Sequence, residues 1–149
     1  MNNFNKNNII LDNNYNLITI SNNALFICNL DGSSNNIAIN NLDSTSLLAF
    51  NKLNNQLIFS NKNKIFVLDE NYNQITSKAF NDNIINIETF NEYVAVKTNN
   101  NIILLKENKI VEGTPLNYDG TCTVRSVSEG DKIDILLTRK KILYNYQLE

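Results

Sequence analysis

Short apolar segments alternate with Asn-rich polar segments along the whole chain. Examples are residues 17–20 (LITI), 65–68 (IFVL) and 93–96 (YVAV), each bounded by polar residues. These segments are rich in β-branched residues, and none continues with the period of an amphipathic helix. Short apolar runs between turn residues are typical of β-strands. The pattern therefore predicts an all-β protein.

The same hairpin pattern occurs four times. An apolar strand ends in Ser or Thr, a polar turn follows, and a second apolar strand completes the hairpin. The four copies begin at Leu17, Gln56, Tyr93 and Asp134. The Ser or Thr residues are Ser21, Ser60, Thr98 and Thr138, separated by 39, 38 and 40 residues. Self-similarity at a nearly constant period indicates a repeat architecture.

Two further strand candidates belong to the repeats. One precedes each hairpin, at residues 8–12, 46–50, 84–90 and 122–128, and one follows the first three, at 36–40, 74–79 and 109–113. A four-stranded unit about every 40 residues is the period of a propeller blade. We therefore expect a single propeller-like domain over residues 1–149, with about four repeats of four antiparallel strands at approximately 8–42, 43–80, 81–116 and 117–149. The fifteen strands found leave the last blade one strand short.

The hairpin resembles the second and third strands of a blade in WD-repeat and related β-propeller proteins. In that family Ser ends the second strand and Trp-Asp ends the third. The residue pairs at the latter position here are Cys28-Asn29, Leu68-Asp69, Leu105-Lys106 and Tyr144-Asn145, and Asp69 keeps the family's acid. The resemblance implies a propeller fold and a non-catalytic platform for proteins or peptides. A β-trefoil and another β-sandwich or barrel are the alternative folds.

The composition excludes several kinds of catalytic and metal site. The chain has no histidine, which rules out Ser-His-Asp and Cys-His catalytic groups and His-based metal sites. Neither Cys28 nor Cys122 has a nearby cysteine partner, so we expect two reduced, mostly buried thiols. The four glycines lack the spacing of a phosphate loop. We expect no metal, no cofactor and no enzymatic activity.

Two segments, residues 12–16 and 69–73, read D-x-N-x-N, which is how a calcium loop begins. Neither segment continues with the glycine and acid that such a loop needs. Asp and Asn also close turns by accepting hydrogen bonds from their own backbone, and this turn interpretation is favoured. The acids Asp31, Asp43, Asp69 and Glu70 are the candidates for a glycosidase pair. No spacing brings them together, so a hydrolase is the third class of function considered.

The charge balance and the N-terminus bear on partners and location. Thirteen Lys and Arg against fifteen Asp and Glu give a net charge of −2, and residues 139–141 (RKK) form the one basic cluster. Nucleic-acid binding is therefore not favoured. There is no signal-like start or membrane-length apolar run, and none of the 32 asparagines begins an N-x-[ST] motif. We expect an intracellular, cytoplasmic protein without membrane contact.

The function most consistent with these features is a non-catalytic protein–protein interaction module, an adaptor or a subunit of a larger assembly. The alternative is a carbohydrate- or nucleic-acid-binding β domain. The last strand leaves an unpaired edge bearing Leu143, Tyr144 and Tyr146, and Phe4 is the large apolar residue near the start. We expect a protein partner or a second copy of the chain to cover this edge. A small closed or curved monomer is the alternative.

Overall fold

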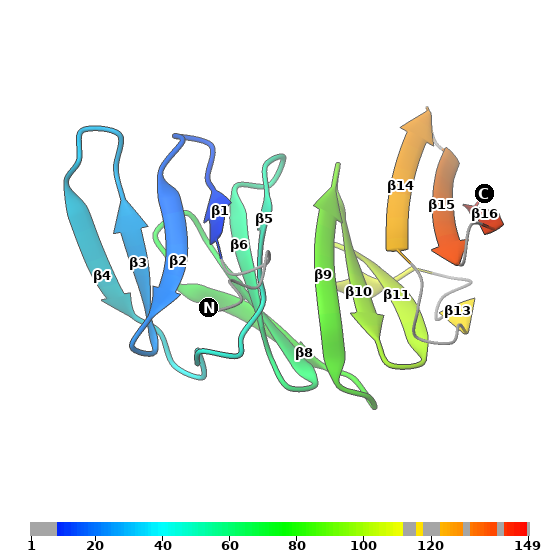
Figure 1. The fold of residues 1–149 in the computed structure, drawn as a ribbon, viewed down its shortest axis with the longest axis horizontal. Coiled ribbons are helices and arrows are strands. Elements are labelled where there is room, and N and C mark those ends of the chain that lie inside the picture. Colours follow the sequence, from blue (N-terminus) through cyan, green and yellow to red (C-terminus); the bar gives the residue numbers. More distant parts are fainter. Residues whose placement is uncertain (1–8, 112–115, 118–122, 130–131, 140–141, 149) are drawn as a thin grey trace.

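The computed structural model describes residues 9–111, 116–117, 123–129, 132–139 and 142–148, with side chains described for residues 9–111. Every regular element in these ranges is a β-strand, and the strands form four antiparallel sheets (Figure 1). The all-β prediction is confirmed. In the described part of the chain, no helix has the length and apolarity needed to cross a membrane.

The first two sheets have four strands each, paired in chain order. The first contains β1 (Ile9–Leu11), β2 (Leu17–Ser21), β3 (Ala24–Cys28) and β4 (Ser34–Ala38). The second contains β5 (Leu48–Asn51), β6 (Gln56–Asn61), β7 (Lys64–Leu68) and β8 (Gln74–Ala79). The strands alternate with tight turns, as the apolar and Asn-rich segments predicted.

The third and fourth sheets repeat the pattern with modifications. The third contains β9 (Ile84–Phe90), β10 (Tyr93–Thr98), β11 (Asn101–Lys106) and β12 (Lys109–Ile110). A further short strand, β13 (Leu116–Asn117), also pairs with β11. The fourth contains β14 (Thr123–Glu129), β15 (Lys132–Arg139) and β16 (Ile142–Leu148), so its described part has three strands.

The sheets follow one another in chain order, with the first and fourth at opposite ends of the molecule (Figure 1). The first strands of successive sheets are neighbours: β1 contacts β5, and β5 contacts β9. Sheets that pack face to face, with their first strands innermost, are the blades of a propeller. The predicted propeller-like fold is confirmed, and the four sheets are called blades 1 to 4 below.

The apolar core lies between the blades. One cluster joins blade 1 to blade 2 and includes Ile18, Leu25, Phe59 and Phe66. The rings of Phe59 and Phe66 stack with centroids 4.8 Å apart. A second cluster joins blade 2 to blade 3 through residues such as Ile58, Val67, Val96 and Ile103. Blade 2 therefore buries both of its faces, which explains why β6 and β7 each contain consecutive apolar residues, at 57–59 and 65–68.

The hairpin registers correct one detail of the predicted repeat. Ser21 is the last paired residue before the first hairpin turn and faces Ala24, but the corresponding pair in blade 2 is Asn61 and Lys64. Ser60 therefore lies one position earlier in its strand than Ser21 does. Because neighbouring strand residues point to opposite faces, a shift of one residue exchanges the two faces. The recurring Ser and Thr residues mark each hairpin but are not equivalent positions.

Candidate functional site

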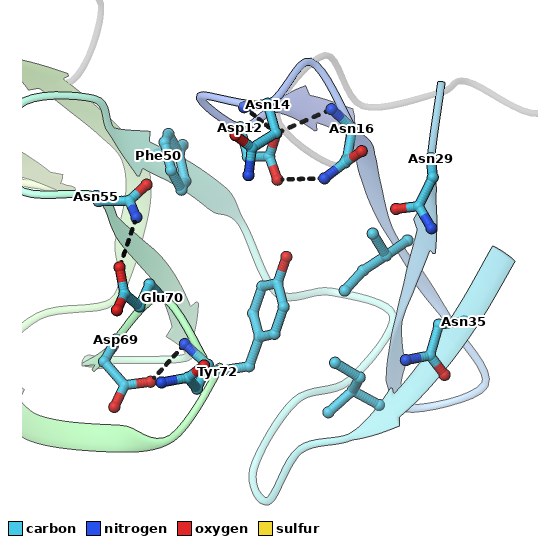
Figure 2. Close-up of a pocket in the computed structure, with 13 residues that line it drawn as sticks. Asp12, Asn14, Asn16, Asn29, Asn35, Phe50, Asn55, Asp69, Glu70 and Tyr72 are labelled. Carbon is cyan, nitrogen blue, oxygen red and sulfur yellow. Dashed lines mark hydrogen bonds between the residues drawn. The ribbon is translucent and has the colours of Figure 1, made fainter. Parts of the chain in front are cut away.

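A polar hollow of about 380 Å³ opens between blades 1 and 2 (Figure 2). Blade 1 contributes its β1–β2 loop, the start of its β3–β4 loop and parts of β3 and β4. Blade 2 contributes part of β5, the β5–β6 loop and the β7–β8 loop. The lining residues are Asp12, Asn14, Asn16, Ile27, Asn29, Asn35, Ile37, Phe50, Asn55, Asp69, Glu70, Asn71 and Tyr72. Carboxylates and amides dominate this surface, and none of the lining residues is Lys or Arg.

The two D-x-N-x-N segments form the same kind of closed loop on opposite sides of the hollow. One carboxylate oxygen of Asp12 accepts hydrogen bonds from the backbone N–H groups of Asn14 and Asn16, both at 2.8 Å. Asp69 accepts equivalent bonds from the N–H groups of Asn71 and Asn73, both at 2.9 Å. The turn interpretation of these segments is confirmed, because each carboxylate closes its own backbone.

A third loop, between β3 and β4, has the same backbone geometry with a different first residue. The N–H of Asn29 donates to the carbonyl of Ser33 at 2.9 Å, as Asp69 N–H donates to the carbonyl of Asn73 at 2.9 Å. The fourth residue of each loop has a positive φ: 83° at Gly32 and 62° at Tyr72. Tyr72 accepts this uncommon conformation because the loop hydrogen bonds hold it there, and its ring is thereby aimed into the hollow (Figure 2).

Hydrogen bonds between the blades hold the walls of the hollow together. The side-chain amide of Asn13 donates to the carbonyl of Lys52 at 2.9 Å and to the amide oxygen of Asn55 at 3.2 Å. The side-chain amide of Asn55 in turn donates to Glu70 at 3.2 Å. Asparagines thus connect the β1–β2 loop to both polar loops of blade 2, and the hollow keeps a defined shape.

Burial, hydrogen bonds and a neighbouring carboxylate shift the pKa values of two side chains that line the hollow. Burial raises the pKa of the Tyr72 hydroxyl, and the nearby Asp12 carboxylate raises it further. The backbone N–H of Asn73 has the largest effect on Asp69 and lowers the pKa of that carboxyl, with further lowering by the Asn71 N–H and the Asn73 side chain and an opposing effect of burial. The carboxyl of Asp69 is therefore held in its charged form.

Three of the acids that sequence analysis singled out lack the raised pKa of a catalytic proton donor. A glycosidase acid needs a raised pKa, whereas the pKa values of Asp31, Asp43 and Asp69 are all lowered. Hydrogen bonds from Ser33 and Thr45 have the largest effect at Asp31 and Asp43, respectively. Among the described side chains, no three acidic or cysteine residues converge as a metal site. Tyr72 and Phe50 beside amide groups suit the alternative of carbohydrate binding, which stays a prediction.

The second candidate site is the outer face of blade 1, which faces away from blade 2. Strand alternation places Ile9, Leu11, Leu17, Thr19, Phe26 and Cys28 on this face, opposite the core residues Ile18, Leu25 and Ile27. Ile9, Leu11 and Leu17 are 43%, 50% and 38% exposed. They are neighbours across β1 and β2, so they form one apolar surface.

The outer face of blade 1 matches the face with which blade 2 packs against blade 1. Counted from the hairpin turn, the pair Thr19 and Phe26 corresponds to Phe59 and Phe66, and the pair Leu17 and Cys28 corresponds to Leu57 and Leu68. The blade 2 residues are all buried against blade 1. The outer face of blade 1 therefore has the register of a surface that packs on a preceding blade.

Several predicted residues have a different or undescribed environment. Cys28, which we expected to be mostly buried, is half-buried because it lies on the outer face of blade 1. Phe4, Cys122, Lys140 and Lys141 lie outside the described residues. Leu143, Tyr144 and Tyr146 lie on β16, which pairs with β15. Their side chains are outside the described part, so the predicted partner-binding edge stays a prediction.

Sequence reasoning missed both the hollow and the outer face of blade 1. The outer face carries one signal that was available, because aligning the hairpins at their turns places Leu17 with Leu57 and Phe26 with Phe66. The hollow had no comparable signal, since its walls come from loops more than 50 residues apart, such as those of Asp12 and Tyr72. Only packing of the two blades brings those loops together.

No protein-family model and no curated protein matches the sequence. Solved structures do match in fold. Sqt1 of Saccharomyces cerevisiae has a TM-score of 0.65 and 9% identity over 89% of this chain. The Pan2 WD40 domain of Neurospora crassa has a TM-score of 0.61 and 12% identity over 94% of this chain. A catalytically inactive virginiamycin B lyase from Staphylococcus aureus, carrying a histidine-to-alanine substitution, has a TM-score of 0.64 and 15% identity over 93% of this chain.

At these identities the similarity concerns the fold, and the similar structures include an enzyme as well as a WD40 domain. The chain spans about half the length of these proteins: 41% of Sqt1, 46% of the Pan2 domain and 54% of the lyase. The described sheets therefore match only part of each of these proteins.

Proposed function

We propose that this chain is a non-catalytic protein–protein interaction module, acting as an adaptor or as a subunit of a larger assembly. The observation that carries the proposal is the exposed apolar outer face of blade 1. Ile9, Leu11 and Leu17 expose 38–50% of their surface there on neighbouring strands. An apolar sheet face of this kind is a site for association rather than a solvated surface.

The absence of catalysis is supported by the chemistry of the side chains. The carboxyls of Asp12 and Asp69 each close a turn, and the pKa of Asp69 is lowered, which suits a structural role. The lyase that shares the fold is inactive when a histidine is replaced by alanine, and this chain contains no histidine. Both observations favour a binding function for this blade arrangement.

The partner that fits the outer face of blade 1 is a polypeptide that presents its own apolar β-sheet. Blade 2 packs on blade 1 through equivalent register positions, among them Phe59 and Phe66. A sheet that approached the outer face would bury Leu17 and Phe26 in the same way. The predicted edge with Leu143, Tyr144 and Tyr146, together with Phe4, belongs to this proposal as a second contact region.

The test compares affinity capture by the tagged chain with capture by two variants. Leu17→Asp places a charge on the outer face, whereas Leu30→Asp places the same charge in the β3–β4 turn, where Leu30 is 77% exposed. We expect wild type and Leu30→Asp to retain the same protein, identified by mass spectrometry, and Leu17→Asp to lose it. Untagged copies of this chain are added in a separate capture experiment, so that a second copy can also be identified as the retained protein.

Equal retention by all three proteins would contradict the assignment of this face. Turnover of a substrate by the purified chain would contradict the non-catalytic function. Circular dichroism of both variants checks that the loss of capture does not come from unfolding.

A further inference from the structure

We propose that a cavity between blades 2 and 3 binds an apolar carboxylate, which is either the last residue of a polypeptide or a small free acid. The cavity has a volume of about 450 Å³, within the range of about 300–1,000 Å³ that is typical of ligand sites. Its lining residues are Phe50, Asn51, Lys52, Leu53, Thr89, Phe90 and Asn91. This site is independent of the outer face of blade 1, on which the proposed function rests.

The walls of the cavity come from two loops that lie at the same end of their blades. One wall is the end of β5 with the β5–β6 loop, and the other is the end of β9 with the turn that follows it (Figure 1). The Thr89 hydroxyl donates to the carbonyl of Phe50 at 2.7 Å, which connects the two walls. The Phe90 ring stacks on Tyr93 with centroids 5.5 Å apart. Both walls are therefore held in place by contacts within the protein.

Asn51 supplies a buried hydrogen-bond donor that the fold leaves unused. Strand alternation places its side chain on the same face of β5 as Ala49, which packs in the core between blades 2 and 3. The amide oxygen of Asn51 accepts the backbone N–H groups of Leu53 at 3.1 Å and Asn54 at 3.2 Å. Its side-chain nitrogen is the one buried side-chain polar atom within residues 9–111 that has no hydrogen-bond partner. A buried donor without an acceptor is rare and costly, so its place beside a cavity points to an acceptor supplied by a ligand.

The other lining residues select the chemistry of that ligand. Because the free group of Asn51 is an N–H donor, the ligand must present an acceptor. Lys52 is the only charged residue among the described residues that line the cavity, so a negatively charged oxygen is favoured over a neutral carbonyl. Phe50, Phe90 and Leu53 supply apolar surface, and Leu53 is 67% exposed. A carboxylate attached to an apolar side chain satisfies all three features.

Titration of the ¹⁵N-labelled full chain, followed by NMR, tests the site directly. The probes are N-acetyl-leucine and N-acetyl-phenylalanine, each as the free acid and as the amide, so that a pair differs only in the carboxylate. We expect the acids to shift the side-chain amide signal of Asn51 and the backbone signals of Lys52 and Thr89. The amides should bind about tenfold more weakly, because they lack the charged acceptor. The Asn51 side-chain signal is identified by its absence from Asn51→Asp.

Two variants separate the contribution of the donor from that of the charge. Asn51→Asp keeps an oxygen that accepts the two backbone N–H groups of the β5–β6 loop, as Asp69 does in its own turn, but it replaces the free donor by an acceptor. It should weaken binding of the acids about tenfold or more. Lys52→Gln should weaken it about two- to fivefold. Lys62→Gln is the matched control, because Lys62 is exposed in the β6–β7 turn, and it should bind as wild type does.

A second pair of probes distinguishes the two sources of the carboxylate. The pair is an acetylated tetrapeptide that ends in leucine, with a free or an amidated C-terminus. Tighter binding of the peptide acid than of N-acetyl-leucine assigns the site to the last residue of a polypeptide. Equal or weaker binding of the peptide acid assigns it to a small free acid.

Three results would overturn the proposal: unchanged Asn51 signals with all the acids, equal binding of acids and amides, or full affinity in Asn51→Asp. Circular dichroism checks the fold of this variant, and the acid–amide comparison and Lys52→Gln decide the question should it be unfolded. None of these results affects the capture experiment with Leu17→Asp and Leu30→Asp. Failure of this inference and failure of the proposed function are therefore distinguishable.

Discussion

Replacement of Phe59 by alanine is the most direct test of the contact between blades 1 and 2. Phe59 is completely buried, and its ring stacks on Phe66 with 4.8 Å between the centroids and 9° between the planes. Its neighbours in the cluster, including Ile18 and Leu25, come from the other blade. The substitution therefore leaves a cavity at the interface that defines the propeller arrangement.

The expected loss follows from burial and stacking. Truncation of a buried Phe to Ala costs about 3–5 kcal/mol, because the transfer free energy of the ring is lost and a cavity remains. The stacked pair contributes about 0.5–1.5 kcal/mol of this amount. For a chain of this size, about 2–4 °C of melting temperature is lost per kcal/mol, which gives a decrease of about 6–20 °C.

Urea unfolding followed by circular dichroism measures the effect, with Phe59→Leu as the control. Leucine fills most of the cavity, so the control should lose only about 1 kcal/mol. The denaturant slope is measured as well, since a lower slope would indicate that blade 1 unfolds separately. A loss below about 1 kcal/mol for Phe59→Ala, with an unchanged slope, would refute the burial of this ring between two blades.

Two further predictions concern hydrogen bonds. The Thr89 hydroxyl donates to the carbonyl of Phe50 at 2.7 Å and joins blade 3 to blade 2, so Thr89→Val should lower the free energy of unfolding by about 1 kcal/mol in urea; no change would contradict the bond. Asp69 has a pKa below its ordinary value of 3.8, so its stabilising effect is present above that pH and is lost as the pH falls through the folded pKa. Asp69→Asn keeps the loop, because Asn29 has the equivalent position in blade 1, and should show less acid destabilisation than wild type in urea midpoints measured at decreasing pH. Equal acid sensitivity would contradict this role of Asp69.

Most of the local structure could be predicted from the sequence, because strands and turns depend on nearby residues. Short apolar runs and Asn-rich turns locate the hairpins, such as the one that turns at Asn22 and Asn23, whose φ values are 50° and 61°. The D-x-N-x-N segments form turns because the carboxylate and its donors lie within four residues of each other. The repeat period then indicated four blades.

The predicted equivalence of the recurring Ser and Thr residues was less accurate, because it was based on residue type rather than on strand pairing. Ser21 and Ser60 both end an apolar run, yet Ser60 is buried and bonds to the N–H of Leu47, whereas Ser21 pairs with Ala24 beside the turn. A register difference of one residue is not visible in the spacing of the hydroxyl residues. It is decided by strand pairing, which is a contact between segments.

The sequence by itself determined the strand content, the turns and the number of repeats of this protein. Only the tertiary structure decided which faces are covered and which loops meet. Leu57 and Leu17 have the same register position, but Leu57 is buried by blade 1 and Leu17 is 38% exposed because no described blade precedes it. The hollow likewise exists because blade packing brings Asp12 close to Tyr72. Burial and electrostatics depend on neighbours that are distant in sequence, and no local pattern specifies those neighbours.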